Sequence, residues 1–200
     1  SDLPMTWVFA GDSITQGVFH THGSRSWVEH VHERLRWQLG RLRDAVINTG
    51  MSGWTAREVL GEFDHLIRRF DPDVVSLSLG MNDVLEGPQG RRVFRDALQQ
   101  LVERSGGLGA QVVLHTPNLA SREALPGRAD LAAYVDVVRE LASQEGAVLV
   151  DHNADWAEHF GRAEPTRWLD DPVHPNASGH QRMADLTLET LGLGPLADRP

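Results

Sequence analysis

The chain contains no cysteine and no lysine among its 200 residues. Without cysteine it forms no disulfide bond and no thiolate-ligated metal site, and its redox compartment is left open. All 19 basic residues are arginine. This excludes a Schiff-base lysine, the phosphate-binding lysine of a Walker motif and a serine–lysine dyad. Every mechanism that depends on lysine is thereby removed.

Positive charge and long apolar runs are also scarce. The 19 basic residues stand against 28 acidic ones, a net charge of −9, which argues against a nucleic-acid binder and against stable association with anionic membranes. No apolar run approaches the length that spans a bilayer, and the start of the chain lacks the pattern of a signal peptide. We expect a soluble protein, cytoplasmic by preference, with a processed secreted protein as the alternative. The composition leaves its oligomeric state open.

The apolar residues alternate between two periods along the chain. Short β-branched runs predict five strands, over 6–10, 45–48, 73–79, 111–115 and 147–151. Helical spacing of apolar residues lies between and after them, over 27–39, 55–70, 93–102, 131–142 and 177–191, with a short piece around Trp156 and Phe160. Alternating strands and helices with near-continuously apolar strands are typical of an α/β domain whose parallel sheet has helices on both faces. We expect one domain over 1–200, with a loosely ordered tail over 193–200.

The first predicted strand breaks into Gly11-Asp12-Ser13-Ile14, a turn that would hold a hydroxyl at the carboxyl edge of the sheet. Ligands of open α/β sheets bind outside this edge, so Ser13 is a candidate nucleophile. The alternative is ordinary turn chemistry, in which Asp12 or Ser13 caps the next helix. The tripeptide alone favours that alternative.

Three further polar segments support the nucleophile. Gly53 follows the second predicted strand, Asn82 follows the third, and Asp171 precedes His174 by three residues in a proline-bounded turn. Acyl transfer by a serine needs an imidazole base, a carboxylate on the other ring nitrogen and donors for the oxyanion. These residue types can supply all three needs at one sheet edge.

The pattern strongly resembles the SGNH hydrolases, also called GDSL esterases and lipases. The resemblance rests on Ser13 in Gly-Asp-Ser-Ile, Gly53 in Gly-Met-Ser-Gly, Asn82 in Gly-Met-Asn-Asp, and Asp171 with His174 in Asp-Pro-Val-His. It implies a flavodoxin-like three-layer α/β/α sandwich around a five-stranded parallel sheet. It also implies ester hydrolysis without a cofactor by the triad Ser13, His174 and Asp171, with an oxyanion hole formed by Ser13, Gly53 and Asn82.

Two positions depart from the family pattern. Ile14 replaces the leucine of the name-giving motif, which is a conservative change. Trp54 stands where many members carry a small polar residue or aspartate, which affects the expected shape of the acyl pocket. An α/β-hydrolase elbow is disfavoured because Thr15 takes the place of the last glycine of Gly-x-Ser-x-Gly.

The substrate is less well determined than the reaction. We expect short-chain esters, acetyl esters first, and O-acetylated carbohydrate as a hypothesis. Candidate substrate-binding residues are Asp12, Arg25, Trp54, His115 and Trp168. Each has a structural alternative: a helix cap for Asp12, a loop before a helix capped by Ser24 or Ser26 for Arg25, and a core position for the others. The alternative functions are a lysophospholipase or thioesterase acting on longer acyl chains, and an inactive carbohydrate-binding member of the fold.

Other polar residues have plainer interpretations. Asp170 competes with Asp171 as the triad acid, and only the Asp-x-x-His spacing selects Asp171. Asp83 is predicted to anchor its loop. The pairs among the ten histidines, such as His20 with His22, are two residues apart, which on a helix does not place them on one face. Since zinc-site signatures are also absent, we expect no metal.

Overall fold

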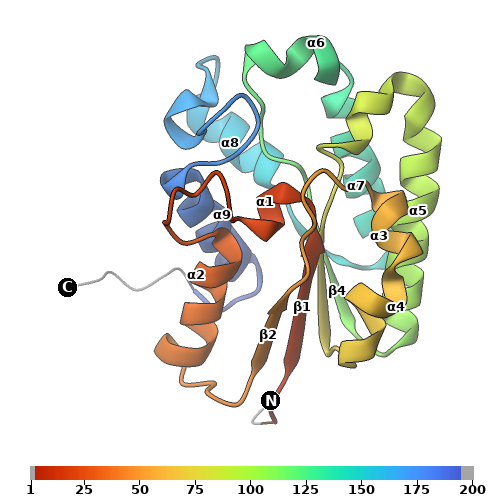
Figure 1. The fold of residues 1–200 in the computed structure, drawn as a ribbon, viewed down its shortest axis with the longest axis vertical. Helices are drawn as coiled ribbons and strands as arrows, with labels where there is room; N and C mark the ends of the chain where they lie inside the picture. Colours follow the sequence, from red (N-terminus) through yellow and green to blue (C-terminus); the bar gives the residue numbers. More distant parts are fainter. Residues whose placement is uncertain (1–2, 195–200) are drawn as a thin grey trace.

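The computed structural model describes residues 3–194 and shows a five-stranded, all-parallel sheet in the order β2-β1-β3-β4-β5 (Figure 1). The strands are β1 (Thr6–Gly11), β2 (Ala45–Asn48), β3 (Val74–Ser78), β4 (Gln111–His115) and β5 (Val148–Val150). This is the flavodoxin-like strand order. The predicted fold class is confirmed, and all five predicted strands are present with ends that differ by no more than one residue.

The strand order reverses at β1, which lies between β2 and β3. Along the β1–β3 pair, Trp7 is opposite Val74 and Gly11 is opposite Ser78. Chain segments leaving the carboxyl ends of these neighbours diverge, which opens a crevice at that edge of the sheet. The residues that follow the two strands include Ser13 and Asn82. The topology therefore brings two predicted site residues to one edge.

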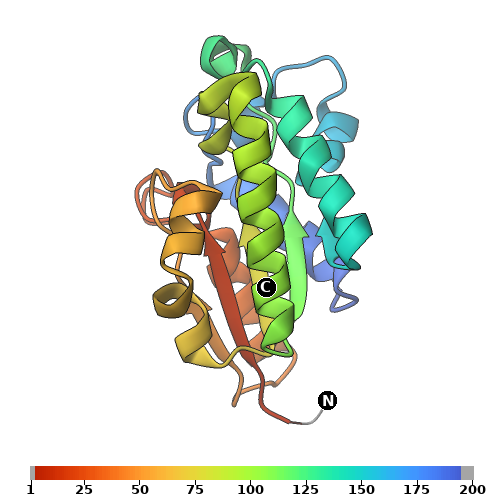
Figure 2. The same ribbon diagram turned by 90° about the vertical axis from the view of Figure 1, so that its right-hand side faces the viewer.

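Helices cover both faces of the sheet. In the two views, α2, α8 and α9 lie on one face and α3, α4, α5 and α7 on the other (Figures 1 and 2). The helices are α1 (Ser13–Gln16), α2 (Trp27–Glu33), α3 (Ala56–Gly61), α4 (Phe63–Leu66), α5 (Gly87–Gly107), α6 (Leu125–Arg128), α7 (Leu131–Glu145), α8 (His152–Phe160) and α9 (Ala177–Thr190). The short helical turns are η1 (Arg34–Gln38), η2 (Arg68–Phe70), η3 (Asp83–Glu86), η4 (Arg122–Ala124) and η5 (Pro165–Trp168).

Two predicted helices differ from the structure in their interior. The helix expected over 55–70 is divided into α3, α4 and η2, because the backbone leaves helical geometry at Glu62 and again at Ile67. A capping box is present at its start, with the Glu58 carboxylate accepting from the N–H of Thr55 at 2.8 Å. The helix expected over 27–39 passes from α2 into the π-helical turn η1 before it stops at Gly40, where φ is +68°.

The core lies between the sheet and both helical layers. Its largest fully buried side chains include Trp27, Trp156, Tyr134, Phe9 and Phe63. The rings of Phe9 on β1 and Trp27 on α2 meet edge to face at 5.4 Å. Burying one such side chain contributes roughly 1.5–3 kcal/mol, so these contacts hold the sheet edge and its loops in place.

The end of the chain is described only to residue 194. The predicted loose tail covers 193–200, and residues 195–200 lie outside the described residues. Within the described part, the carbonyl of Leu193 accepts from the Arg34 guanidinium at 2.8 Å. No helix in residues 3–194 is long and apolar enough to cross a membrane.

Candidate active site

Ser13 is the first residue of α1, directly after the end of β1. The Asp12 carboxylate caps this short helix by accepting from the N–H of Ile14 at 2.9 Å. A Cβ at Gly11 would lie 2.5 Å from the carbonyl oxygen of Ser78, so only glycine allows β1 to approach β3 this closely before the turn. The chain leaves α1 at Gly17 with φ of +65°. The turn thus places a half-buried Ser13 at the sheet edge.

Asp171 and His174 come from a narrow loop before α9. An antiparallel bridge pairs Leu169 with Pro175 at the base of the loop, and the N–H of Asp170 donates to the carbonyl of His174 at 2.8 Å. The Asn176 side chain then caps α9, accepting from two backbone N–H groups at 3.0 and 3.1 Å. Hydrogen bonds at the base of the loop and at the start of α9 therefore hold both of its ends in place.

The three predicted triad residues form one continuous hydrogen-bonded chain. The Asp171 Oδ2 atom accepts from His174 Nδ1 at 2.7 Å, and the Ser13 hydroxyl donates to His174 Nε2 at 2.8 Å. Asp171 Oδ1 accepts from the backbone N–H groups of Val173 and His174 at 2.8 and 2.7 Å. A carboxylate can only accept, so Nδ1 carries the ring proton and leaves Nε2 free to take the proton of Ser13. The structure selects Asp171, and not Asp170, as the carboxylate on His174.

The ionisation of these groups suits proton transfer near neutral pH. Burial lowers the pKa of His174 below its usual 6.5, and this outweighs the opposite effect of Asp171; His20 and Arg128 lower it further. Burial also opposes ionisation of Asp171, but its bonds from His174 and Val173 prevail and lower the pKa of the carboxyl. At neutral pH the site therefore holds a neutral imidazole beside a carboxylate.

Three donors that could face a developing oxyanion lie in loops packed against one another. A Cβ at Gly50 would lie 2.4 Å from the backbone nitrogen of Gln16, so the loop after β2 lies directly against α1. The Asn82 amide donates one hydrogen to the carbonyl of Trp54 at 3.0 Å, which ties η3 to the residue after Gly53. Within residues 3–194, the N–H groups of Ser13 and Gly53 donate to no protein acceptor.

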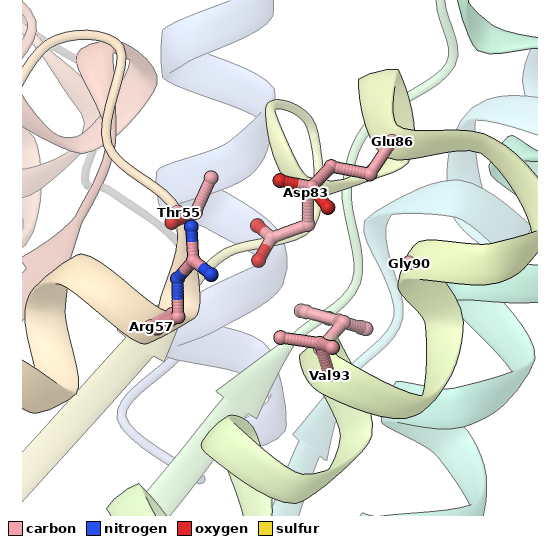
Figure 3. Close-up of a pocket in the computed structure, with 7 residues that line it drawn as sticks. Thr55, Arg57, Asp83, Glu86, Gly90 and Val93 are labelled. Carbon is pink, nitrogen blue, oxygen red and sulfur yellow. The ribbon is translucent and has the colours of Figure 1, made fainter.

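Asp83 anchors these loops. Its carboxylate accepts from the N–H of Ala56 at 2.9 Å and from the N–H of Gly80 at 3.1 Å, and burial raises its pKa to about 6. It thereby links the start of α3 to the turn that carries Asn82, as the sequence predicted. The cavity beside it in Figure 3 has a volume of about 10 Å³, room for about one water and not for a substrate. Its lining residues are Thr55, Arg57, Asp83, Glu86, Gly90, Val93 and Phe94.

Three predicted substrate-binding residues occupy partly exposed positions. Arg25 forms an ion pair with Glu33 along α2, next to the helix cap made by Ser26. Trp54 is half-buried, and its carbonyl holds Asn82. The Trp168 ring stacks on His159 at 4.2 Å within an aromatic cluster around α8. Their roles in binding stay predictions.

The other two candidates, Asp12 and His115, are buried. Asp12 is 2% exposed and is engaged as the cap of α1, and burial raises its pKa to about 7. His115 is 1% exposed, and its ring is bonded to Ser76 at 2.8 Å and to His152 at 3.0 Å. Both side chains are buried and bonded within the fold, and their roles in binding also stay predictions.

Two residues near the triad were not among the predicted site residues. The ring of His20 lies on the ring of His174, with centroids 3.6 Å apart. The Arg128 guanidinium donates to the carbonyl of Met81 at 3.1 Å; burial lowers its pKa, and the nearby Asp171 carboxylate opposes this effect. Neither residue belongs to a motif at a strand end. Only the folded chain brings them to the site.

Comparison with known proteins gives a consistent result. The GDSL-like lipase/acylhydrolase family model matches residues 9–182. The chain is 29% identical over 204 residues to an acetylxylan esterase of Geobacillus stearothermophilus, covering 92% of this chain and 93% of the relative. A crystal structure of an acetylxylan esterase of that organism superposes with a TM-score of 0.82 at 26% identity, covering 98% and 97% of the two chains. The thioesterase 1/protease 1/lysophospholipase L1 of Escherichia coli strain K12 is 25% identical over 180 residues, covering 90% of this chain and 80% of its own.

Proposed function

The chain belongs to the GDSL-like lipase/acylhydrolase family and is a carboxylic ester hydrolase, and from this premise we propose that it removes acetyl and other short acyl groups by a serine mechanism. The observation that carries the proposal is the hydrogen-bonded chain from Ser13 through His174 to Asp171, with distances of 2.8 and 2.7 Å. It has the order and the protonation that nucleophile activation needs.

In the first half-reaction, Ser13 Oγ attacks the acyl carbon while His174 Nε2 takes the hydroxyl proton. Asp171 stabilises the imidazolium that forms and holds its Nδ1 proton in place. The bond to the alcohol oxygen then breaks, and His174 returns its proton to that oxygen. In the second half-reaction, water replaces the alcohol, with His174 again serving first as base and then as acid. The sequence yields the free alcohol and the free acid.

The tetrahedral intermediates place a negative charge on the former carbonyl oxygen. We assign its stabilisation to the backbone N–H groups of Ser13 and Gly53 and to the second amide hydrogen of Asn82. The first two have no acceptor within the described chain, and the bond from Asn82 to Trp54 fixes the direction of its amide. Donors held in position before the reaction stabilise the developing charge without a reorganisation cost.

Acetyl esters of carbohydrates are the substrate class that we favour. The nearly full-length similarity to an acetylxylan esterase supports this choice. Polar groups of His20 and Arg128 lie near His174, and beside His20 the Phe19 ring is 78% exposed. An exposed aromatic ring next to polar groups is suited to a sugar face. Hydrolysis of longer acyl chains, as the similarity to the Escherichia coli lysophospholipase suggests, is the competing activity.

The reaction is tested by hydrolysis of p-nitrophenyl acetate by the wild type, Ser13→Ala and Ser52→Ala. Ser52 is the matched control because it is an exposed serine in the neighbouring glycine-containing loop. We expect Ser13→Ala to lose turnover and Ser52→Ala to keep it. Activity should rise with pH through one ionisation below the usual histidine pKa of 6.5. Equal activity of Ser13→Ala and the wild type would contradict the nucleophile assignment.

The acyl group is tested by comparing kcat/KM for p-nitrophenyl acetate and octanoate, and by measuring acetate release from acetylated xylan. The proposal predicts a preference for acetate and release of acetate from the polysaccharide. A clear preference for octanoate would favour the thioesterase or lysophospholipase alternative. No serine-dependent turnover in a well-folded protein would favour the inactive, carbohydrate-binding alternative.

A further inference from the structure

His20 covers one face of His174. The two rings are stacked with centroids 3.6 Å apart and planes inclined by only 10°. The Phe19 ring in turn contacts the His20 ring edge to face, with the two centroids 5.0 Å apart. The hydrogen bonds of His174 to Asp171 and Ser13 lie in the plane of its ring. The stack with His20 instead contacts the face of the ring, perpendicular to that plane.

The stack is anchored by the carboxylate next to the triad acid. Asp170 Oδ2 accepts from His20 Nδ1 at 3.2 Å, and Asp170 Oδ1 accepts from His22 Nε2 at 2.8 Å. His20 Nδ1 also lies 3.5 Å from Asp171 Oδ2. Asp170 thus joins the loop after α1 to the loop that carries Asp171 and His174, although about 150 residues separate the two loops in sequence.

The sequence analysis weighed His20 and His22 as a metal-binding pair and disfavoured that interpretation on helical spacing. In the structure they lie in a loop, and both contact one carboxylate, which helical spacing does not allow for. The nitrogens of His20 and His174 and a carboxylate oxygen of Asp171 come within 4.8 Å of one another. A metal ion binds an imidazole nitrogen in the plane of its ring. Parallel rings stacked at 3.6 Å cannot both direct their Nδ1 lone pairs at one ion, so this arrangement favours ring positioning over metal binding.

We propose that His20 is a positioning residue for the general base His174, and this inference rests on the proposed function. Hydrogen bonds at Nδ1 and Nε2 fix the two nitrogens but leave the ring able to tilt about the line that joins them. A ring stacked on the face opposes this tilt. During turnover His174 must carry a proton from Ser13 to the leaving oxygen, and a ring that does not tilt keeps the lone pair and the N–H of Nε2 directed at these oxygens.

The test compares His20→Phe with His20→Ala. Phenylalanine keeps a flat ring over His174 and loses the bond to Asp170, whereas alanine removes the ring. Because a displacement of about 1 Å at a catalytic group can cost about 100-fold in rate, we expect His20→Ala to lose about 10- to 100-fold in kcat with little change in KM. The kcat of His20→Phe should stay within about threefold of the wild-type kcat, a much smaller loss than that of His20→Ala. His65→Ala, at an exposed histidine of α4, serves as the control.

A measurement that does not depend on turnover separates this inference from the proposed function. In the full-length protein, the Nδ1 proton that His174 shares with Asp171 should give a slowly exchanging NMR signal in the wild type and in His20→Phe. It should exchange faster in His20→Ala. An unchanged signal and an unchanged kcat in His20→Ala would overturn the inference, as would a loss in His20→Phe as large as in His20→Ala. A wild type that hydrolyses no ester but shows these NMR differences would contradict the proposed function and leave the positioning of His174 supported.

Discussion

Replacing Asp171 by asparagine is expected to lower kcat about 10⁴-fold without unfolding the protein, which corresponds to about 5.5 kcal/mol of activation free energy. The reason lies in the second oxygen of the carboxylate. Asp171 Oδ1 accepts from two backbone N–H groups of its own loop, at 2.8 and 2.7 Å. An asparagine oxygen can keep both bonds, so the fold of the loop is preserved.

The amide nitrogen must then face His174 Nδ1, where the carboxylate oxygen accepted before. An amide nitrogen can only donate, so His174 has to place its own proton on Nε2. In that tautomer Nε2 points an N–H at Ser13 and can no longer take the hydroxyl proton. Turning the amide over does not help, because its NH₂ group would then oppose two backbone N–H donors.

The assay is kcat and KM for p-nitrophenyl acetate, with circular dichroism and thermal unfolding to verify the fold. Asp170→Asn is the matched control, because the same chemical change is made one residue earlier, on a carboxylate that contacts His20 and His22. We expect it to lose no more than about tenfold, or about 1.4 kcal/mol. The reasoning is refuted if Asp171→Asn keeps more than about a tenth of the wild-type kcat. It is also refuted if Asp171→Asn and Asp170→Asn are equally impaired.

Three further predictions concern the oxyanion donor, the turn and the buried acid. Asn82→Ala should remain folded and lose about 10²–10³ in kcat on acetyl esters, and full kcat would show that its amide is not an oxyanion donor. Gly11→Ala should be strongly destabilising, because the new Cβ would lie 2.5 Å from the carbonyl oxygen of Ser78; a melting temperature equal to that of the wild type would contradict the geometry of this turn. Burial raises the pKa of Asp12 from 3.8 to about 7, so the folded protein holds this proton more tightly than the unfolded chain. The wild type should therefore lose stability relative to Asp12→Asn as the pH rises from about 4 to about 7, by about 4 kcal/mol in all, and urea unfolding of both proteins across this range would test it.

The strands and the order of the polar segments were determined by the sequence. Apolar runs bounded by turn residues are a local signal, and buried parallel strands give it in its strongest form. The capping box at Thr55 and the left-handed residue Gly146 after α7, where φ is +66°, are local features of the same kind. The family resemblance depends on four short segments in a given order, and the fold brings the side chains of Ser13, Asp171 and His174 into contact.

The sequence left the interior of one helix and the burial of two site candidates undetermined. The pattern over 55–70 is compatible with one helix, but the chain divides it, with breaks at Glu62 and Ile67. Position after a strand made Asp12 and His115 candidates for substrate binding. Whether such a side chain faces the crevice or the core is set by packing, and both side chains are buried.

Tertiary structure alone decided what surrounds His174. No spacing in the sequence connects His20 to a loop about 150 residues away, and the stack forms because two separate turns end at the same sheet edge. Arg128 reaches the triad in the same way, through a bond to the carbonyl of Met81. The sequence by itself determined the fold and the residue types that do the chemistry, because these depend on local patterns. The orientation and protonation of those residues depend on which other groups the folded chain brings against them.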